Sequence, residues 1–286
     1  MARQSAGSGV GGKGEAVLFI VATPIGNLAD MTQRAVETLR SADLVLAEDT
    51  RKTRVLLDHF GIKARMVAAH AHNEAKTIPL VLEELGRGAS VAIVTDAGTP
   101  LISDPGSRLV RSVRGAGYRV SPIPGPSALT AALSAAGLDT TRFTFFGFLA
   151  RSGRERQEAL DEISALSHTV VLYESPLRVA DTLGDVATSG PADRHCVVAR
   201  ELTKVFEEFR DGTVGELAAY YAESPPRGEV VILLAGVDPK PFSEEELRIR
   251  VKALREAGVS ARDAAAQVSS ETGVPRNAVY KMAMKS

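Results

Sequence analysis

The sequence predicts an α/β protein of two lobes, followed by a small all-helical C-terminal domain. Short apolar runs rich in β-branched residues alternate with amphipathic stretches, a pattern typical of parallel strands joined by crossover helices. A rigid turn, Pro124-Gly125-Pro126, interrupts this alternation near its middle. After Asp238-Pro239-Lys240-Pro241 the chain becomes charged and helical. We therefore predict a flexible tail (1–15), an N-terminal α/β lobe (16–122), a C-terminal α/β lobe (123–237) and a helical domain (242–286).

The first lobe is predicted to hold four strands, each an apolar run such as VLFIVA or SVAIVT. Amphipathic segments between them predict helices, and Asp30 is placed to cap the first of these. Strands separated by helices are expected to be parallel. The predicted strands are 17–22, 43–47, 90–95 and 118–122, and the predicted helices are 31–41, 78–85 and 108–115.

The second lobe is predicted to begin with a helix, 127–136, because Pro126 and Ser127 suit a helix start. An aromatic strand, FTFFGF, follows at 143–148. Ser175-Pro176 predicts a further helix start after the strand 170–173. Further strands are predicted at 196–199, 206–210 and 230–234.

The C-terminal segment predicts a helix–turn–helix, with helices at 261–272 and 276–284. Gly258 and Gly273 stand where helices are expected to end.

Composition bounds the function. The 286 residues are 44% hydrophobic and 24% charged, which predicts a sizeable core. A net charge of −1 argues against nonspecific nucleic-acid binding but leaves room for local basic patches. The single cysteine, Cys196, lies in an apolar run and is interpreted as a buried hydrophobe. It suits a reducing compartment and supplies no metal cluster. With no apolar run near the roughly 20 residues of a membrane span, a cytoplasmic protein without membrane contact is expected.

Three loops that follow predicted strands carry small, rigid and polar residues. Ligands of α/β proteins bind at the carboxyl ends of strands. The segment ATPIGNL lacks the glycine triplet of a dinucleotide site. An ordinary tight turn explains this segment at least as well as a ligand-binding loop does. In TDAGTPLISDPG, Asp96 is placed to accept hydrogen bonds from a ligand and Gly98 permits close approach, whereas Asp104 has a helix cap as its structural alternative. IPGPSA is either a ligand-binding helix start or a hinge.

Six segments occur in the order VATPIGNLAD, EDTRKT, AHNE, TDAGTPLISDPG, PIPGPSA and VLYESPLR. Together they resemble the ribosomal RNA small subunit methyltransferase I group of the tetrapyrrole-methylase-like superfamily. The resemblance implies two α/β lobes with S-adenosylmethionine between them, a homodimer, and 2′-O-methylation of a cytidine in the decoding region of 16S rRNA in the small ribosomal subunit. Motif by motif, it implies cofactor contacts at Pro24, Asp96, Ala97, Gly98, Ile102, Ser103, Ser127, Ala128, Tyr173 and Leu202.

A ribose hydroxyl is a poor nucleophile and benefits from a proton acceptor. The candidates, in order of preference, are Glu48, Asp104 and His72. Asp49 and Glu74 are also present in these segments, and Asp49 beside Arg51 is equally consistent with a surface ion pair. Basic clusters suit RNA phosphates, although a solvated helix face or a dimerisation bundle are the structural alternatives. The predicted RNA-binding residues are Arg51, Lys52, Arg54, Arg151, Arg154, Arg276 and Lys281, and no metal is expected.

Two other functions remain open at this point. The first is C-methylation of a tetrapyrrole precursor, against which the helical domain and the AHNE and EDTRKT segments argue, because a small macrocycle needs no such extra contacts. The second is a noncatalytic RNA-binding ribosome assembly factor with a vestigial cofactor pocket. Intact Asp96, Gly98 and Ser127 argue against it.

Overall fold

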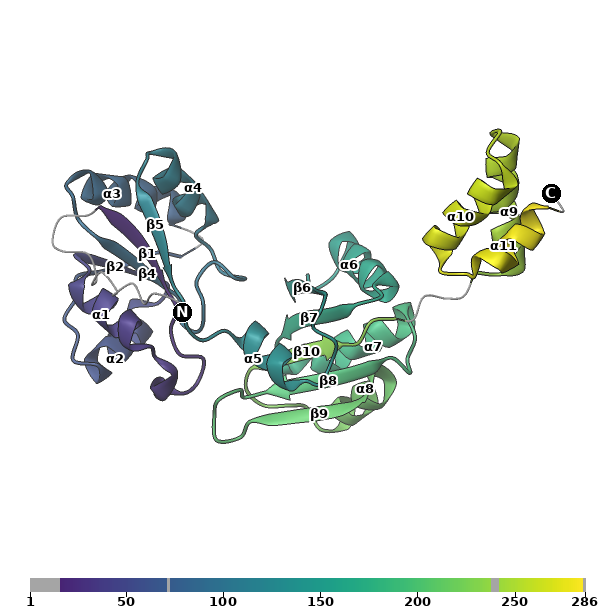
Figure 1. Ribbon diagram of the computed structural model, residues 1–286. Coiled ribbons are helices and arrows are strands. Elements are labelled where there is room, and N and C mark those ends of the chain that lie inside the picture. Colours follow the sequence, from purple (N-terminus) through teal and green to yellow (C-terminus); the bar gives the residue numbers. More distant parts are fainter. Residues whose placement is uncertain (1–15, 71–72, 238–241, 285–286) are drawn as a thin grey trace, which may run out of the picture. The chain divides into compact units, whose positions relative to one another are not determined.

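A computed structural model describes residues 16–70, 73–237 and 242–284 (Figure 1). The chain divides into two compact units, Met1–Val237 and Asp238–Ser286. The larger unit contains two five-stranded sheets, and the smaller unit contains only helices among its described residues. The predicted tail (1–15), the predicted linker (238–241) and His72 lie outside the described residues.

The first sheet is entirely parallel, with strand order β3-β2-β4-β1-β5. The chain leaves β1 toward one side of the sheet and leaves β4 toward the other. The carboxyl ends of these neighbouring strands therefore form the kind of crevice where α/β proteins bind ligands. The strands are β1 (Val17–Val21), β2 (Leu44–Ala47), β3 (Met66–Ala68), β4 (Val91–Val94) and β5 (Arg119–Ile123).

Helices cover both faces of the first sheet (Figure 1). Side chains alternate along each strand: in β4, Ala92 and Val94 face α1 and α2, whereas Val91 and Ile93 face α3 and α4. Both faces of the central strands β1, β2 and β4 are therefore buried, which explains why these strands are continuous apolar runs. The helices are α1 (Gln33–Ser41), α2 (Thr50–His59), α3 (Glu74–Gly86) and α4 (Ser107–Gly115).

The second sheet is mixed, with order β6-β7-β10-β8-β9. Only β6 and β7 pair in parallel, and the other three pairs are antiparallel. The strands are β6 (Phe143–Phe148), β7 (Thr169–Glu174), β8 (His195–Arg200), β9 (Glu208–Thr213) and β10 (Val230–Leu234).

One face of the second sheet packs against three helices, and the other packs against α5. Cys196 is fully buried and unbonded in the first of these cores, as predicted, and burial raises the pKa of its thiol. The helices are α5 (Ala128–Ala135), α6 (Arg154–Ala165), α7 (Val179–Ser189) and α8 (Val214–Glu223), with the 3₁₀ turn Pro176–Arg178 before α7.

The smaller unit consists of α9 (Glu244–Glu256), α10 (Ala261–Thr272) and α11 (Arg276–Ala283) around its own apolar core. A capping box between Ser243 and Glu246 starts α9. Gly258 and Gly273 follow α9 and α10 with positive φ, which confirms their predicted positions at helix ends. Within the described residues no helix has the length and apolarity to cross a membrane.

Two local predictions are wrong, and the structural alternative for Asp104 is excluded. The cap of α1 is Thr32, whose hydroxyl accepts from Ala35 N, because Asp30 ends a preceding 3₁₀ turn. Asp104 does not cap α4, whose N-cap is Gly106. The strand predicted at 206–210 begins at Glu208 and runs to Thr213, because the preceding residues form a loop.

Candidate functional site

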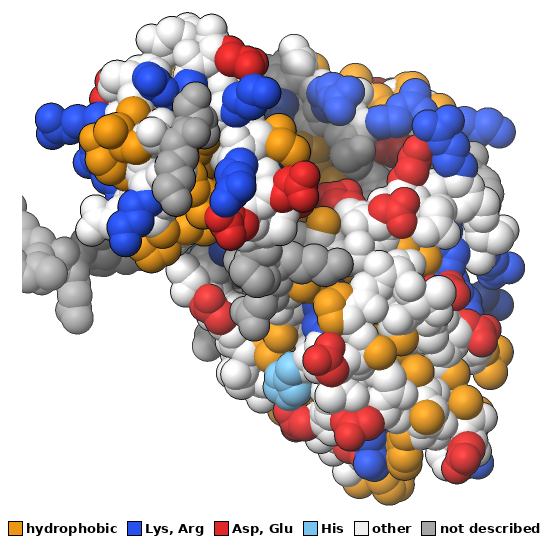
Figure 2. All heavy atoms as spheres, turned by 90° about the vertical axis from the view of Figure 1, so that its right-hand side faces the viewer, with side chains coloured by type: hydrophobic (Ala, Val, Ile, Leu, Met, Phe, Trp, Pro, Cys, Tyr) orange, Lys and Arg blue, Asp and Glu red, His pale blue; other side chains and the backbone are white. Residues whose placement is uncertain are grey.

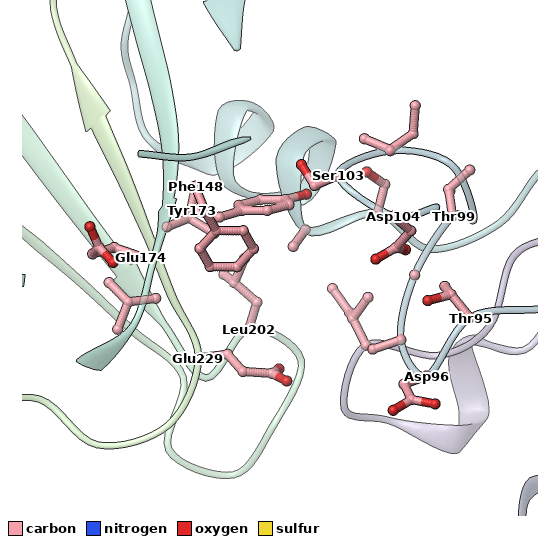
Figure 3. Close-up of a pocket in the computed structure, with 18 of the residues that line it drawn as sticks. Thr95, Asp96, Thr99, Ser103, Asp104, Phe148, Tyr173, Glu174, Leu202 and Glu229 are labelled. Carbon is pink, nitrogen blue, oxygen red and sulfur yellow. The ribbon is translucent and has the colours of Figure 1, made fainter. Parts of the chain in front are cut away.

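A pocket of about 410 Å³ opens where the carboxyl ends of β2 and β4 face the ends of β6, β7 and β8 (Figure 3). This volume falls within the roughly 300–1,000 Å³ of small-molecule sites. The lining residues come from both sheets of the larger unit: Ile25, Glu48, Thr95, Asp96, Ala97, Gly98, Thr99, Ile102, Ser103, Asp104, Ser127, Ala128, Phe148, Tyr173, Glu174, Ser175, Pro176, Leu202, Gly228, Glu229, Val230 and Val231.

The turn after β4 is tied to the turn after β1. Thr23 N donates to Gly98 O at 2.9 Å, and Gly98 N donates to Thr23 O at 3.1 Å. The buried Thr23 hydroxyl also donates to Thr95 O. Gly98 has φ +83°, and an added Cβ would lie 3.3 Å from Ile25 Cγ2, so glycine suits this position. These bonds fix the backbone on one wall of the pocket.

Glu48, at the end of β2, holds the start of the same turn. Its Oε2 accepts from the Thr95 hydroxyl at 2.6 Å and from Asp96 N at 3.3 Å. Asp96 in turn accepts from Asp49 N through Oδ1 and from Lys52 Nζ through Oδ2, at 3.1 and 2.8 Å. The two carboxylates therefore join the loops after β2 and β4 into one hydrogen-bonded wall.

Asp104 is a half-buried carboxyl group on the same wall. Burial raises the pKa of Asp104, the charges of Glu48 and Asp96 act in the same direction, and a hydrogen bond with Thr95 opposes them. A carboxyl group with a raised pKa is a better proton acceptor than an ordinary surface carboxylate. The Thr95 side chain thus contacts both candidate proton acceptors of this wall.

The charge of the pocket is negative. Its lining has five carboxylates, and in the part of the chain that is described it includes no Lys, Arg or His. Three of the carboxylates pair with basic side chains outside the lining: Asp96 with Lys52, Glu174 with Arg178, and Glu229 with Lys204. No described basic side chain forms an ion pair with Glu48 or Asp104. Such a pocket suits a ligand that carries positive charge.

Two loops that face the pocket contain residues in the left-handed region. Leu101 and Ser103 flank Ile102 with φ values of 72° and 65°, and Glu201 and Thr203 flank Leu202 with values of 51° and 66°. These are the only non-glycine residues with positive φ among those described. Such conformations cost free energy and concentrate at ligand-binding sites. Each loop thereby directs one apolar side chain to the pocket.

Tyr173 and Phe148 line the opposite wall (Figure 3). The Tyr173 hydroxyl accepts from Leu129 N at 3.0 Å, and burial raises the pKa of this hydroxyl. Glu174 is buried, and its carboxylate accepts from Ser175 N and from the Thr182 hydroxyl, each at 2.7 Å. This wall is therefore held by bonds within the second lobe.

The structure brings nine of the ten predicted cofactor residues to the pocket lining, and Pro24 is the one that is not part of it. Its neighbour Ile25 lines the pocket instead. Of the predicted proton acceptors, Glu48 and Asp104 line the pocket, whereas His72 lies outside the described residues. The other two acidic candidates have structural partners: Asp49 caps α2, and Glu74 accepts from Leu109 N of α4.

Several lining residues were not predicted. Glu174, Ser175 and Pro176 belong to the segment VLYESPLR, so a signal for them was present. Residues 228–231 gave no signal, because they reach the pocket only when β10 runs antiparallel to β7 and β8. The sequence predicts Phe148 only as part of a strand, and the irregularity that turns it toward the pocket is not visible in the sequence.

The predicted RNA-binding residues differ in their surroundings. Arg51 pairs with Asp49, and the exposed Arg154 pairs with Glu158 one turn along α6. Arg54, Arg151 and Lys281 are exposed, and Arg276 donates to the backbone of Arg262. Figure 2 shows basic and acidic side chains intermixed on the face that it draws. No cluster of three or more metal-ligating side chains is found in the described residues.

Two families match the chain. Tetrapyrrole (Corrin/Porphyrin) Methylases match residues 17–218, and the RsmI C-terminal HTH domain matches residues 241–286. Among curated proteins, Ribosomal RNA small subunit methyltransferase I of Synechocystis is 44% identical over 94% of this chain and 98% of its own length. The protein of the same name from Escherichia coli O157:H7 is 47% identical over 94% of both chains.

Solved structures agree with the fold of the larger unit. Cobalt precorrin-4 methyltransferase, a cobalamin biosynthetic enzyme, superposes with a TM-score of 0.61 and 20% identity over 78% of this chain and 97% of its own. Uroporphyrin-III-C-methyltransferase from Thermus thermophilus superposes with a TM-score of 0.55 and 18% identity over 77% and 94%. At these identities the likeness confirms the predicted fold class and nothing further.

Proposed function

The chain belongs to the ribosomal RNA small subunit methyltransferase I family of the tetrapyrrole methylases, and we propose that it transfers a methyl group from S-adenosylmethionine to a ribose 2′-hydroxyl. The proposed acceptor is a cytidine in the decoding region of 16S rRNA within the small ribosomal subunit, and the proposed working form is a homodimer. The observation that carries the chemistry is a cofactor-sized pocket in which Asp104 and Glu48 have no basic partner among the described residues.

The pocket residues fit S-adenosylmethionine, which supplies an activated methyl group on a positively charged sulfur when bound. Carboxylates without basic partners favour a cation through electrostatic attraction. Asp96 and the backbone of Ala97 and Gly98 offer polar groups for hydrogen bonds, and Ile102 and Leu202 offer apolar contacts on facing loops. We propose that these residues hold the cofactor.

The reaction forms a bond between the ribose 2′-oxygen and the methyl carbon, and breaks the bond between that carbon and sulfur, which keeps the electron pair. The 2′-hydroxyl proton must leave, and we propose that Asp104 accepts it. Glu48 is less suited, because its Oε2 already accepts two hydrogen bonds that hold the turn after β4. Most of the acceleration then comes from positioning, because the methyl group is already activated.

Transfer of labelled methyl from S-adenosylmethionine tests this function. Small ribosomal subunits from a strain without the enzyme and a tetrapyrrole precursor are offered in parallel, and products are identified by nucleoside mass spectrometry. We expect a 2′-O-methylated cytidine in the subunit RNA. Label in the tetrapyrrole alone would contradict the RNA substrate, and label in neither would favour a noncatalytic assembly factor.

The position of the cofactor can be tested separately. Asp96→Ala should weaken S-adenosylmethionine binding in calorimetry while the protein stays folded by circular dichroism. Asp58→Ala, which removes an exposed carboxylate of α2 away from the pocket lining, is the matched control. Unchanged binding by Asp96→Ala would remove Asp96 from the proposed cofactor site.

A further inference from the structure

Phe148 is a large aromatic side chain that stays exposed at the pocket. It ends β6, it lines the pocket, and 58% of its surface is accessible. A single exposed hydrophobic residue is ordinary on protein surfaces. An exposed ring at a pocket that two loops shape is a different case, because its position there has a structural cause.

The cause is an irregularity in the pairing of β6 with β7. Phe145 pairs with Val171, Gly147 pairs with Leu172, and Phe148 pairs with Tyr173, so one extra residue stands between 145 and 147. Such bulges bend a strand and redirect its side chains, often beside active sites. Regular alternation would place Phe148 on the face of Phe146, which packs in the core under α6 and α7.

The bulge instead places Phe148 on the face of Phe145, toward the pocket. Gly147 makes this possible, because its φ of +64° suits glycine and a Cβ there would lie 2.8 Å from Ser103 Oγ. The Phe148 ring then lies edge-on against the Tyr173 ring, with centroids 5.6 Å apart. Tyr173 is itself fixed by Phe145 and by Leu129 N. The contact with Tyr173 therefore holds the exposed Phe148 ring in place.

The chain that follows Phe148 is basic and exposed. Arg151 and Arg154 come three and six residues later, and both side chains are exposed. Ile102, which also lines the pocket, is exposed on the strained loop that carries Asp104. Single-stranded RNA binds where aromatic rings accept unstacked bases and nearby cations accept phosphates. An exposed aromatic ring and neighbouring arginines match that combination.

We propose that Phe148 is a stacking platform for the base of the target nucleotide, which leaves the RNA stack and places its ribose at Asp104. This inference rests on the proposed function and names how its substrate is held. The base stacks on Phe148, and the arginines contact the adjoining phosphates. An aromatic ring recognises any base face, so Phe148 contributes affinity and position rather than a choice among bases.

The test compares Phe148→Ala and Phe148→Tyr with the wild type. Binding of unmodified small subunits is measured by filter binding, and S-adenosylmethionine binding is measured by calorimetry. We expect Phe148→Ala to weaken subunit binding roughly 10- to 100-fold, the range of a lost base–aromatic stack. Phe148→Tyr should retain binding, and cofactor affinity should be unchanged in both.

Phe143→Ala is the matched control, since Phe143 is the same residue type at the other end of β6, 42% exposed and absent from the pocket lining. It should bind subunits like the wild type. Wild-type subunit affinity in Phe148→Ala would overturn the inference, and so would a loss confined to cofactor binding, which would assign the ring to the cofactor. Subunit binding that depends on Phe148 without any methyl transfer would support the inference and contradict the proposed function.

Discussion

The Lys52 ammonium group lies 2.8 Å from the Asp96 carboxylate. Lys52 stands in the first turn of α2 and was predicted to contact RNA, whereas Asp96 lines the pocket and was predicted to contact the cofactor. The hydrogen bond to Asp96 raises the pKa of Lys52, which keeps it charged. A ligand that needs Asp96 Oδ2 must therefore compete with Lys52, and an RNA phosphate that attracts Lys52 would release the carboxylate. The pair links the two proposed binding events.

Lys52→Met should bind S-adenosylmethionine more tightly and RNA more weakly than the wild type. The expected gain in cofactor affinity is at most about fivefold, because an exposed ion pair contributes about 1 kcal/mol or less. Arg54→Met is the control on the same helix, and it should weaken RNA binding without changing cofactor affinity. Calorimetry measures the affinity for S-adenosylmethionine, and filter binding measures the affinity for RNA. Weaker cofactor binding by Lys52→Met would show that Lys52 supports the cofactor.

Asp104 gives a prediction that depends on pH. Burial raises its pKa in the folded protein above the ordinary value of 3.8, so folding favours the protonated form. Its contribution to stability is then complete below that ordinary value, and it is lost as pH rises through the higher folded pKa. Asp104→Asn stays neutral at every pH. It should melt at a higher temperature than the wild type at neutral pH, with the difference disappearing in acid.

The same variant should lose methyl transfer, because an amide cannot accept the 2′-hydroxyl proton. Thermal melts between about pH 3 and pH 8, a range that brackets ordinary and raised carboxyl values, together with single-turnover assays, test both effects. Asp58→Asn on α2 should change neither. Full activity in Asp104→Asn would indicate that Glu48, rather than Asp104, accepts the proton.

Thr203 predicts a trade between stability and binding. It is β-branched with φ 66°, and its buried hydroxyl has no hydrogen-bond partner among the described residues. Both features cost free energy. Thr203→Gly should therefore raise the free energy of unfolding by about 1 kcal/mol, and should weaken cofactor binding by freeing the Leu202 loop. Thr203→Ser, which keeps the hydroxyl, should show a smaller stabilisation. Destabilisation by glycine would contradict the proposed strain.

Continuous apolar runs predict the central strands of the first lobe. Residues buried on both faces give continuous β-branched runs, and such runs identify the strands 17–22 and 90–95 to within a residue or two of β1 and β4. The sequence does not predict the short strand β3, because all three of its residues are only half-buried. The antiparallel pairing of the second sheet could not be predicted either, because pairing is decided by contacts between distant segments rather than by local pattern.

The sequence indicates candidate site residues in those loops whose residue types are disfavoured in strands and helices. The run from Asp96 to Asp104 combines glycine, proline and acidic residues in this way. Lys52 shows what sequence cannot supply: a basic cluster is visible, but its pairing with Asp96 depends on how close the start of α2 lies to the turn after β4. Phe148 shows the same limit, since only the register of β6 against β7 reveals which face it occupies.

Removal of the smaller unit should separate RNA binding from cofactor binding. Its core, which includes Leu247, Val251 and Val279, is built from its own helices, and the larger unit closes with Val237 N donating to Leu166 O. A chain ending at Val237 should therefore stay folded and keep its S-adenosylmethionine affinity, while its subunit affinity falls. Replacing Arg276 and Lys281 with methionine in the full chain should weaken subunit binding and flatten its dependence on salt, since each phosphate contact contributes to that slope. If truncation lowered both affinities equally, the helical unit would have a structural role instead. If the full-length double variant kept the salt dependence of the wild type, the RNA contacts would lie elsewhere.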